Sequence, residues 1–113
     1  MEWAMFVNKI KKERINDYIE KVKSIPIDMP QQPEAAKNAG LRSQLVFVDN
    51  ENSVVYIIMG SENMKEFMEN FSKIEDVQKW NDGAKPMIEE KKDVIYLDKI
   101  YDFEDVIKKM NIR

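Results

Sequence analysis

Apolar and polar positions follow two different periods along this chain. Residues 3–10 are dense in apolar side chains that partly alternate, which predicts a strand. Residues 11–24 place apolar side chains at helical spacing with charged residues between them, which predicts an amphipathic helix. Residues 41–60 predict two strands joined at 49–52, because a polar tetrapeptide of this kind closes hairpins.

Prolines interrupt the chain between this helix and the hairpin. Pro26, Pro30 and Pro33 cannot continue a regular helix, so they predict a loop or turn segment. An alternative is that Pro33 begins a short helix through Asn38, closed by Gly40.

The second half of the chain predicts two helical pieces and a fourth strand. Ser61 is expected to cap a helix whose apolar face carries Met64, Phe67, Met68, Phe71 and Ile74. A second helical piece begins at Glu75 and ends or bends near Gly83. Residues 93–101 predict a fourth strand, and residues 103–110 predict a short terminal helix.

The predicted order of strand, helix, strand, strand, helix, strand is the ferredoxin-like βαββαβ arrangement, an α+β fold. We expect one domain, 1–113, with a C-terminal helical extension at about 103–113. The runs 54–59 and 94–97 are apolar at every position, so both faces of these strands require burial. A homodimer with two sheets face to face, a dimeric α/β barrel, would bury them; alternatively, the proline segment and C-terminal helix cover the second face.

Composition narrows the chemistry that the chain can perform. It has no cysteine and no histidine, which removes thiolate nucleophiles, imidazole bases and the usual zinc ligands. Acid–base work would fall to Asp, Glu, Lys or Tyr. With 18 Lys+Arg against 21 Asp+Glu, mixed along the chain, there is little support for a nucleic-acid partner.

Targeting and cofactor signals are also missing from the sequence. Only three glycines occur, with no phosphate-binding loop and no metal-spaced carboxylates, so we expect no cofactor and no metal. The N-terminus has no basic region followed by a cleavage site, and there is no apolar run of membrane-spanning length. We therefore expect a cytoplasmic protein without a membrane partner.

Two places carry candidate chemistry. Tyr18 lies on the predicted first helix beside the proline segment, where it is either a catalytic phenol or a core side chain. Trp80 lies among polar residues near a helix break, in the segment 78–87. An exposed indole face commonly stacks on a sugar ring, although a core position for Trp80 is equally consistent with the pattern. Met64 and Met68 are expected to pack in the core.

The chain resembles the L-rhamnose mutarotase family of small dimeric α/β-barrel proteins over most of its length. The resemblance is in pattern and spacing, through residues 4–10, Tyr18, 38–59, 77–80, Met87 and 94–101. Its most specific elements are Tyr18 and the Gln-x-Trp motif from Gln78 to Trp80. The resemblance implies interconversion of the α and β anomers of a free, rhamnose-like monosaccharide, which requires proton carriers on opposite sides of the ring.

The sequence departs from the family pattern at several positions. The family's histidine, one helical turn after the tyrosine, corresponds to Val22 if the helix register is kept, or to Ser24 if the following Pro-Ile is matched. The tandem tryptophan of the family is here Trp80-Asn81, and an Asn-Tyr pair on the second strand is Ser43-Gln44.

The resulting hypothesis is an isomerase, an aldose mutarotase of carbohydrate metabolism. Tyr18 would act as proton donor or anchor, with a nearby carboxylate of raised pKa. The candidate catalytic residues are Tyr18 and Asp17, with Asp28 a further carboxylate close by. The candidate sugar-binding residues are Trp80, Asn81, Gln44 and Lys21. The alternative is a non-catalytic binding or interaction protein that has this fold without the histidine.

Overall fold

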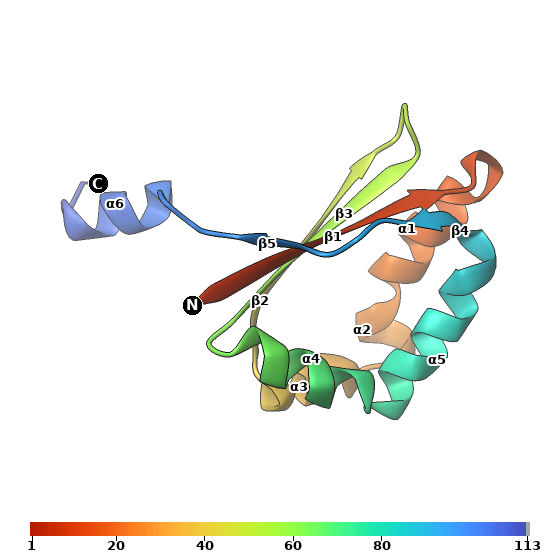
Figure 1. The fold of residues 1–113 in the computed structure, drawn as a ribbon, viewed down its shortest axis with the longest axis horizontal. Helices are drawn as coiled ribbons and strands as arrows, with labels where there is room; N and C mark the ends of the chain where they lie inside the picture. The colour runs from red at the N-terminus through yellow and green to blue at the C-terminus, as the bar shows by residue number, and fades with distance from the viewer. Residues whose placement is uncertain (113) are drawn as a thin grey trace.

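The computed structural model describes residues 1–112 and contains an antiparallel sheet with helices against one face (Figure 1). The sheet order is β2-β3-β1-β4, and β5 pairs with β1 beyond β4 on the same edge. The strands are β1 (Glu2–Ile10), β2 (Leu41–Asp49), β3 (Val54–Ser61), β4 (Ile88–Lys91) and β5 (Ile95–Leu97).

Helices α1 to α5 lie on one side of this sheet, whereas α6 lies apart from them beyond its end (Figure 1). Element order and sheet order together confirm the predicted ferredoxin-like α+β fold. No helix within residues 1–112 is long and apolar enough to span a membrane. The helices are α1 (Ile15–Lys23), α2 (Ile25–Asp28), α3 (Gln32–Ala39), α4 (Met64–Ser72), α5 (Glu75–Ala84) and α6 (Phe103–Lys109), with 3₁₀ turns at Lys12–Arg14 and Lys85–Met87.

The core lies between the sheet and these five helices, on what we call the inner face of the sheet. Ala4 pairs with Met59 and packs with Phe67 of α4, and Val55 packs with Tyr18 of α1. Because side chains alternate along a strand, the even positions of β1 face this core with the odd positions of β3. The fold therefore buries the inner face of β1 and β3, whereas Val46 and Val48 on the inner face of β2 stay 40% and 38% exposed.

The other side of the sheet, the outer face, has no covering element among residues 1–112. Strand alternation and register assign to it Trp3, Met5, Leu45, Phe47, Tyr56, Ile58, Ile95 and Leu97. Phe47 is 54% exposed and Ile95 is 44% exposed. The suggestion that the proline segment and terminal helix cover this face is wrong for this structure, since α2 and α3 lie on the helical side and α6 stands apart (Figure 1).

The proline segment is more helical than the expected loop. Pro26 and Pro33 each lie in the first turn of a helix, α2 and α3, where a backbone N–H has no intrahelical partner to lose. The alternative of a short helix beginning near Pro33 is confirmed. It ends at Gly40, whose φ of 118° is readily available only to glycine.

The cap of α4 differs from the sequence-based expectation. The Asn63 side chain accepts a hydrogen bond from the Glu66 N–H at 3.1 Å and is the N-cap. Ser61 is still in β3, and its hydroxyl donates to the Gly40 carbonyl at 2.8 Å. The N-cap therefore lies two residues after the predicted one, because the strand continues through Ser61.

The predicted fourth strand, 93–101, is also too long. The structure divides this edge into β4, which was not predicted, and the three-residue β5. The predicted terminal helix exists as α6, and the last residue of the expected extension, Arg113, lies outside the described residues.

Candidate functional site

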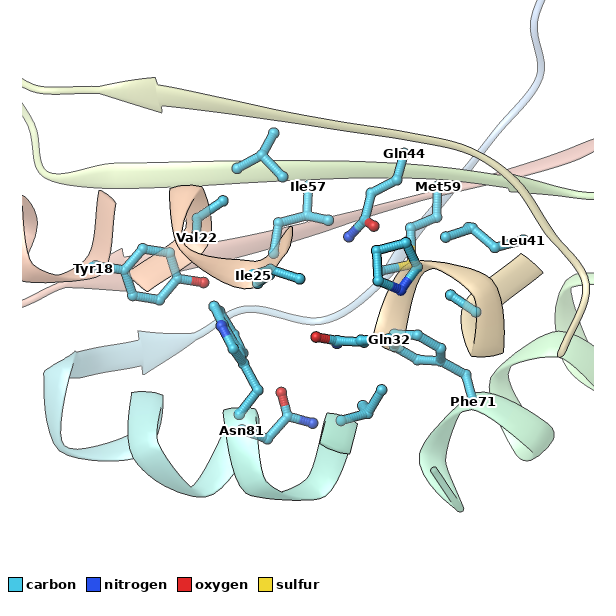
Figure 2. A pocket seen from close by; sticks show the side chains of 15 residues that line it. Tyr18, Val22, Ile25, Gln32, Leu41, Gln44, Ile57, Met59, Phe71 and Asn81 are labelled. Carbon is cyan, nitrogen blue, oxygen red and sulfur yellow. The ribbon is translucent and has the colours of Figure 1, made fainter. Parts of the chain in front are cut away.

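A cavity of about 240 Å³ lies between the inner face of the sheet and the helices (Figure 2). A second cavity of about 300 Å³ adjoins it and shares Tyr18, Trp80 and Asn81 with it. Together they have the size of a small-molecule site. The first cavity is lined by Tyr18, Val22, Ile25, Gln32, Pro33, Ala36, Leu41, Gln44, Val46, Ile57, Met59, Phe71, Val77, Trp80 and Asn81.

The fifteen lining residues are mostly apolar, and none of them carries a charge at neutral pH. Polar side chains enter from three elements: Gln32 from α3, Gln44 from β2 and Asn81 from α5 (Figure 2). No group of three or more His, Cys, Asp or Glu side chains suited to holding a metal ion occurs within residues 1–112. The lining of the first cavity fits a neutral ligand with few polar groups, whereas Lys91 and Lys92 bring positive charge to the lining of the second.

Tyr18 brings a hydroxyl group into this apolar space. The residue is 1% exposed, and its hydroxyl makes no hydrogen bond to another described residue. Burial raises the pKa of the phenol, and the nearby Asn8 side chain, which lowers it, offsets this only in part. At neutral pH Tyr18 is therefore protonated and free to donate or accept.

Gln32 supplies a second buried polar atom without a partner. It is 8% exposed at the first position of α3, and its side-chain carbonyl oxygen has no hydrogen bond within residues 1–112. In Figure 2, Tyr18 and Gln32 enter the cavity from different sides. Leaving such a group unpaired costs about 1–3 kcal/mol, so two of them in one cavity mark it as a place where a bound molecule would be stabilised.

Trp80 of α5 forms a wall next to Tyr18. The two rings meet edge to face, with centroids 5.7 Å apart and planes at 79°. The indole N–H donates a long hydrogen bond of 3.5 Å to the Lys21 carbonyl, and the Lys21 Nζ lies 5.4 Å from the ring centroid. Lys21 therefore fixes the indole and covers part of it, although it does not line the cavity.

The structure brings four of the six predicted site residues together and separates two. Tyr18, Gln44, Trp80 and Asn81 all line the first cavity. Lys21 contacts the Trp80 indole without lining the cavity, and Asp17 is exposed with its carboxylate 2.8 Å from the Arg14 Nε. The assigned roles of all six remain predictions.

The two alternatives for the absent histidine are also separated. Val22 lines the cavity, whereas the Ser24 hydroxyl donates to the Lys21 carbonyl at 2.9 Å and is not part of the lining. The position that keeps the helix register is therefore the one at the cavity, and it is apolar. Sequence reasoning missed Gln32, because a glutamine before a proline carried no signal for burial.

Comparisons with known proteins support the fold and no narrower grouping. No family model matches the chain, and no curated protein sequence matches it. An L-rhamnose mutarotase from Formosa agariphila has a similar structure at 18% identity and a TM-score of 0.64, covering 91% of this chain and 99% of that one.

Other similar structures have different descriptions. A putative antibiotic biosynthesis monooxygenase from Nitrosomonas europaea matches with a TM-score of 0.68 at 10% identity, covering 89% of this chain and 100% of that one. A dimeric ferredoxin-like protein from an uncultured marine organism matches at 8% identity with a TM-score of 0.67, covering 90% of each chain. At these identities the similarities establish that the chain has the ferredoxin-like fold of this broad group of small proteins.

Proposed function

We propose that this protein binds a compact, largely apolar and neutral small molecule in the cavity beneath the sheet. The molecule would carry a hydroxyl or carbonyl group that pairs with Tyr18, and a hydrogen-bond donor that pairs with Gln32. The absence of charge from the fifteen lining residues supports a neutral ligand, since a bound ion would lose its hydration without gaining a counter-charge.

The observation that carries this proposal is the unpartnered Tyr18 hydroxyl. A tyrosine selected only for packing would expose its oxygen or bond it, because an unpaired buried hydroxyl is destabilising. Here the oxygen is buried without a partner and lines a cavity. A ligand atom or a water molecule at that point would satisfy it.

The test is a screen of small neutral fragments by ¹H–¹⁵N NMR. We expect bound fragments to shift the amides around the cavity on α1, α3 and α5. Tyr18→Phe and Gln32→Leu should each weaken the best fragment about fivefold to a hundredfold, the range for loss of one hydrogen bond. Tyr56→Phe and Glu34→Gln are the matched controls, on the outer face and on the exposed side of α3, and should bind as wild type. A screen without such fragments, or equal weakening by the controls, would reject the proposal.

A second candidate function is sugar mutarotation. It is supported by the position of the predicted residues, because Tyr18, Gln44, Trp80 and Asn81 line one cavity. The chemistry is less well supported, because anomerisation needs a proton acceptor as well as a donor. Tyr18 with its raised pKa is a donor at neutral pH, and neither cavity has a carboxylate to accept; the lysines Lys91 and Lys92 line only the second cavity. The apolar lining would also leave several sugar hydroxyls unpaired.

Magnetisation-exchange NMR on free rhamnose and fucose separates the two candidates. Binding without catalysis predicts exchange rates equal to those in buffer. Acceleration that is lost in Tyr18→Phe and retained in Tyr56→Phe would establish the mutarotase and overturn the simpler binding function.

A further inference from the structure

The second cavity differs from the first in the charge of its lining. Its volume is about 300 Å³, and its seventeen lining residues include two lysines, Lys91 and Lys92. None of the seventeen, which all lie within residues 1–112, is acidic. Most of the others are apolar, with Phe6, Phe67 and Ile88 among them. Such a lining favours a ligand that joins an apolar body to an anionic group.

The two cavities extend toward opposite edges of the sheet. Gln44 of β2 lines only the first cavity, whereas Lys91 of β4 lines only the second. These strands stand at opposite ends of the sheet order (Figure 1). Tyr18 and Trp80 line both cavities, so they lie where the two adjoin. The β4 side can therefore hold a molecule of its own, with different chemistry from one on the β2 side.

Strand pairing directs the Lys91 side chain toward this cavity. Lys91 lies opposite Asn8 in the antiparallel pair of β4 and β1, and opposite residues of such a pair share one face of the sheet. Asn8 is at an even position of β1, on the inner face, and its side chain also lines the second cavity near Tyr18. An ammonium and an amide N–H thus line one end of the cavity, and both can donate to a carboxylate.

The acidic residues of β4 are engaged by other lysines. The Glu89 Oε2 lies 3.4 Å from the Lys9 Nζ, and the Glu90 Oε2 lies 3.7 Å from the Lys92 Nζ. Lys91 forms no ion pair with another residue of the range 1–112. Its ammonium therefore remains available to a ligand.

The exposure of Lys91 makes this charge compatible with an apolar cavity. The residue is exposed, whereas Phe67 at the inner end of the cavity is 1% exposed. An anionic group at the lysine keeps contact with water, so it avoids the large cost of burying a charge. The apolar body of the same molecule is removed from water inside the cavity, which stabilises the complex.

We propose that the second cavity is a subsite for a small carboxylate with an apolar body, of the class of arylacetic or short alkanoic acids. The carboxylate binds the Lys91 ammonium and the Asn8 amide, and Lys92 adds to the local positive charge. This subsite is separate from the neutral-ligand site of the first cavity and does not depend on it. Tyr18 lies between the two and can contact either occupant.

A matched pair of probes tests the charge requirement in the full chain. Phenylacetate and phenylacetamide have nearly the same shape, but only phenylacetate is an anion. In ¹H–¹⁵N NMR titrations we expect phenylacetate to bind more tightly and to shift the amides of Asn8, Lys91 and Lys92 more than those of residues 32–39. Added sodium chloride should weaken phenylacetate and not phenylacetamide, because salt screens the ion pair. The absence of phenylacetate binding, equal affinities, or shifts centred on residues 32–39 would overturn the proposal.

Lysine variants locate the charge that matters. Lys91→Gln should weaken phenylacetate about threefold to tenfold, so its preference over phenylacetamide should shrink by the same factor. Lys91→Gln combined with Lys92→Gln should weaken it further. Lys9→Gln is the matched control: it removes the same charge one residue from Asn8, but Lys9 lines neither cavity and should leave phenylacetate binding unchanged. Equal weakening by Lys9→Gln would reduce the effect to general attraction and reject the subsite.

The outcome is distinguishable from that of the proposed function. Gln32 lines only the first cavity, so Gln32→Leu should weaken neutral fragments and leave phenylacetate as in wild type. Loss of phenylacetate binding in Gln32→Leu would show that the anion occupies the first cavity, and the second subsite would be rejected. Failure of the neutral screen alone would leave the carboxylate subsite standing.

Discussion

The two faces of the sheet are formed by the same strands, but they differ in which kind of group is left without a partner. In β3, Val55, Ile57 and Met59 point to the inner face, where helices cover them and a cavity remains. Tyr56 and Ile58 point to the outer face, where no element of residues 1–112 covers them. The inner face is covered by helices along β1 and β3, and its cavity contains polar atoms without partners. The outer face is open and contains apolar groups without partners.

This difference indicates which kind of partner each face would bind. Buried unpaired polar atoms are satisfied by a small molecule or water that can hydrogen-bond. An extended apolar surface is stabilised when a large contact area removes it from water, and a second protein surface can supply that area. The same chain thus separates a ligand site from a contact site by the alternation of side chains along its strands.

The largest expected effect compares phenylalanines on the two faces. Phe67 is 1% exposed in the inner core, so Phe67→Ala should lower the free energy of unfolding of the protein by about 3–5 kcal/mol. Phe47→Ala on the outer face should cost about 0.5 kcal/mol or less in the isolated chain. Urea unfolding at a concentration where the protein is monomeric measures both. Equal costs would mean that the outer face is already covered within the chain.

A second comparison concerns two glycines with similar close contacts. A Cβ at Gly60 would lie 2.9 Å from the Trp3 ring, so Gly60→Ala should cost about 1–3 kcal/mol through displacement of a large side chain. A Cβ at Gly83 would meet only the mobile end of Lys21, at 2.8 Å, and the residue is inside α5. Gly83→Ala should therefore gain about 0.5–1 kcal/mol from helix propensity.

Thermal and urea unfolding of both glycine variants measure these changes. Destabilisation of similar size in both would show that Lys21 is held as firmly as Trp3.

The outer face should control assembly and not ligand binding. Phe47→Asp should weaken the dimer about tenfold or more in sedimentation, because it places a charge in an apolar contact. Arg42→Gln, at an exposed position of the same strand, is the control. A Phe47→Asp variant that dimerises as wild type would exclude this face from the interface.

The inner face should show a pH dependence that the outer face lacks. Burial raises the pKa of Tyr18 above the value of about 10 found in the unfolded chain. As pH rises, the unfolded chain releases this proton first, so the contribution of Tyr18 is present below pH 10 and is lost through the folded-state pKa. Wild type should therefore lose stability relative to Tyr18→Phe above about pH 10, whereas Tyr56→Phe should follow wild type. Parallel curves for all three would show that Tyr18 ionises freely.

Much of the fold was predictable because hydrophobic periodicity encodes it. The hairpin, the amphipathic α1 and the two pieces α4 and α5 have strong periods and were predicted. β4 was not, because "IEEK" has no strand pattern and is placed by pairing with Asn8 and Lys9 of β1. α2 was read as loop because the breaking effect of Pro26 was weighed without its tolerance in a first turn.

The candidate site was predictable only where a residue type carried its own signal. Tyr18 and Trp80 stood out as large aromatic residues near helix ends, and both line the cavity. Gln32 gave no signal, since its burial depends on how α3 packs under the sheet. Asp17 was chosen for closeness in sequence to Tyr18, but adjacent helical residues point in different directions, and it lies in solvent.

The most direct test of the cavity as a ligand site is urea unfolding of wild type and Tyr18→Phe, each with and without the best fragment. Without ligand, Tyr18→Phe should equal or exceed wild type by about 1 kcal/mol, because an unpaired buried hydroxyl is removed. With ligand the order should reverse, because only wild type gains the hydrogen bond. Tyr56→Phe should behave as wild type in both conditions. A Tyr18→Phe variant that is less stable when empty, and that gains as much from ligand as wild type, would make the phenol a structural group and contradict the account.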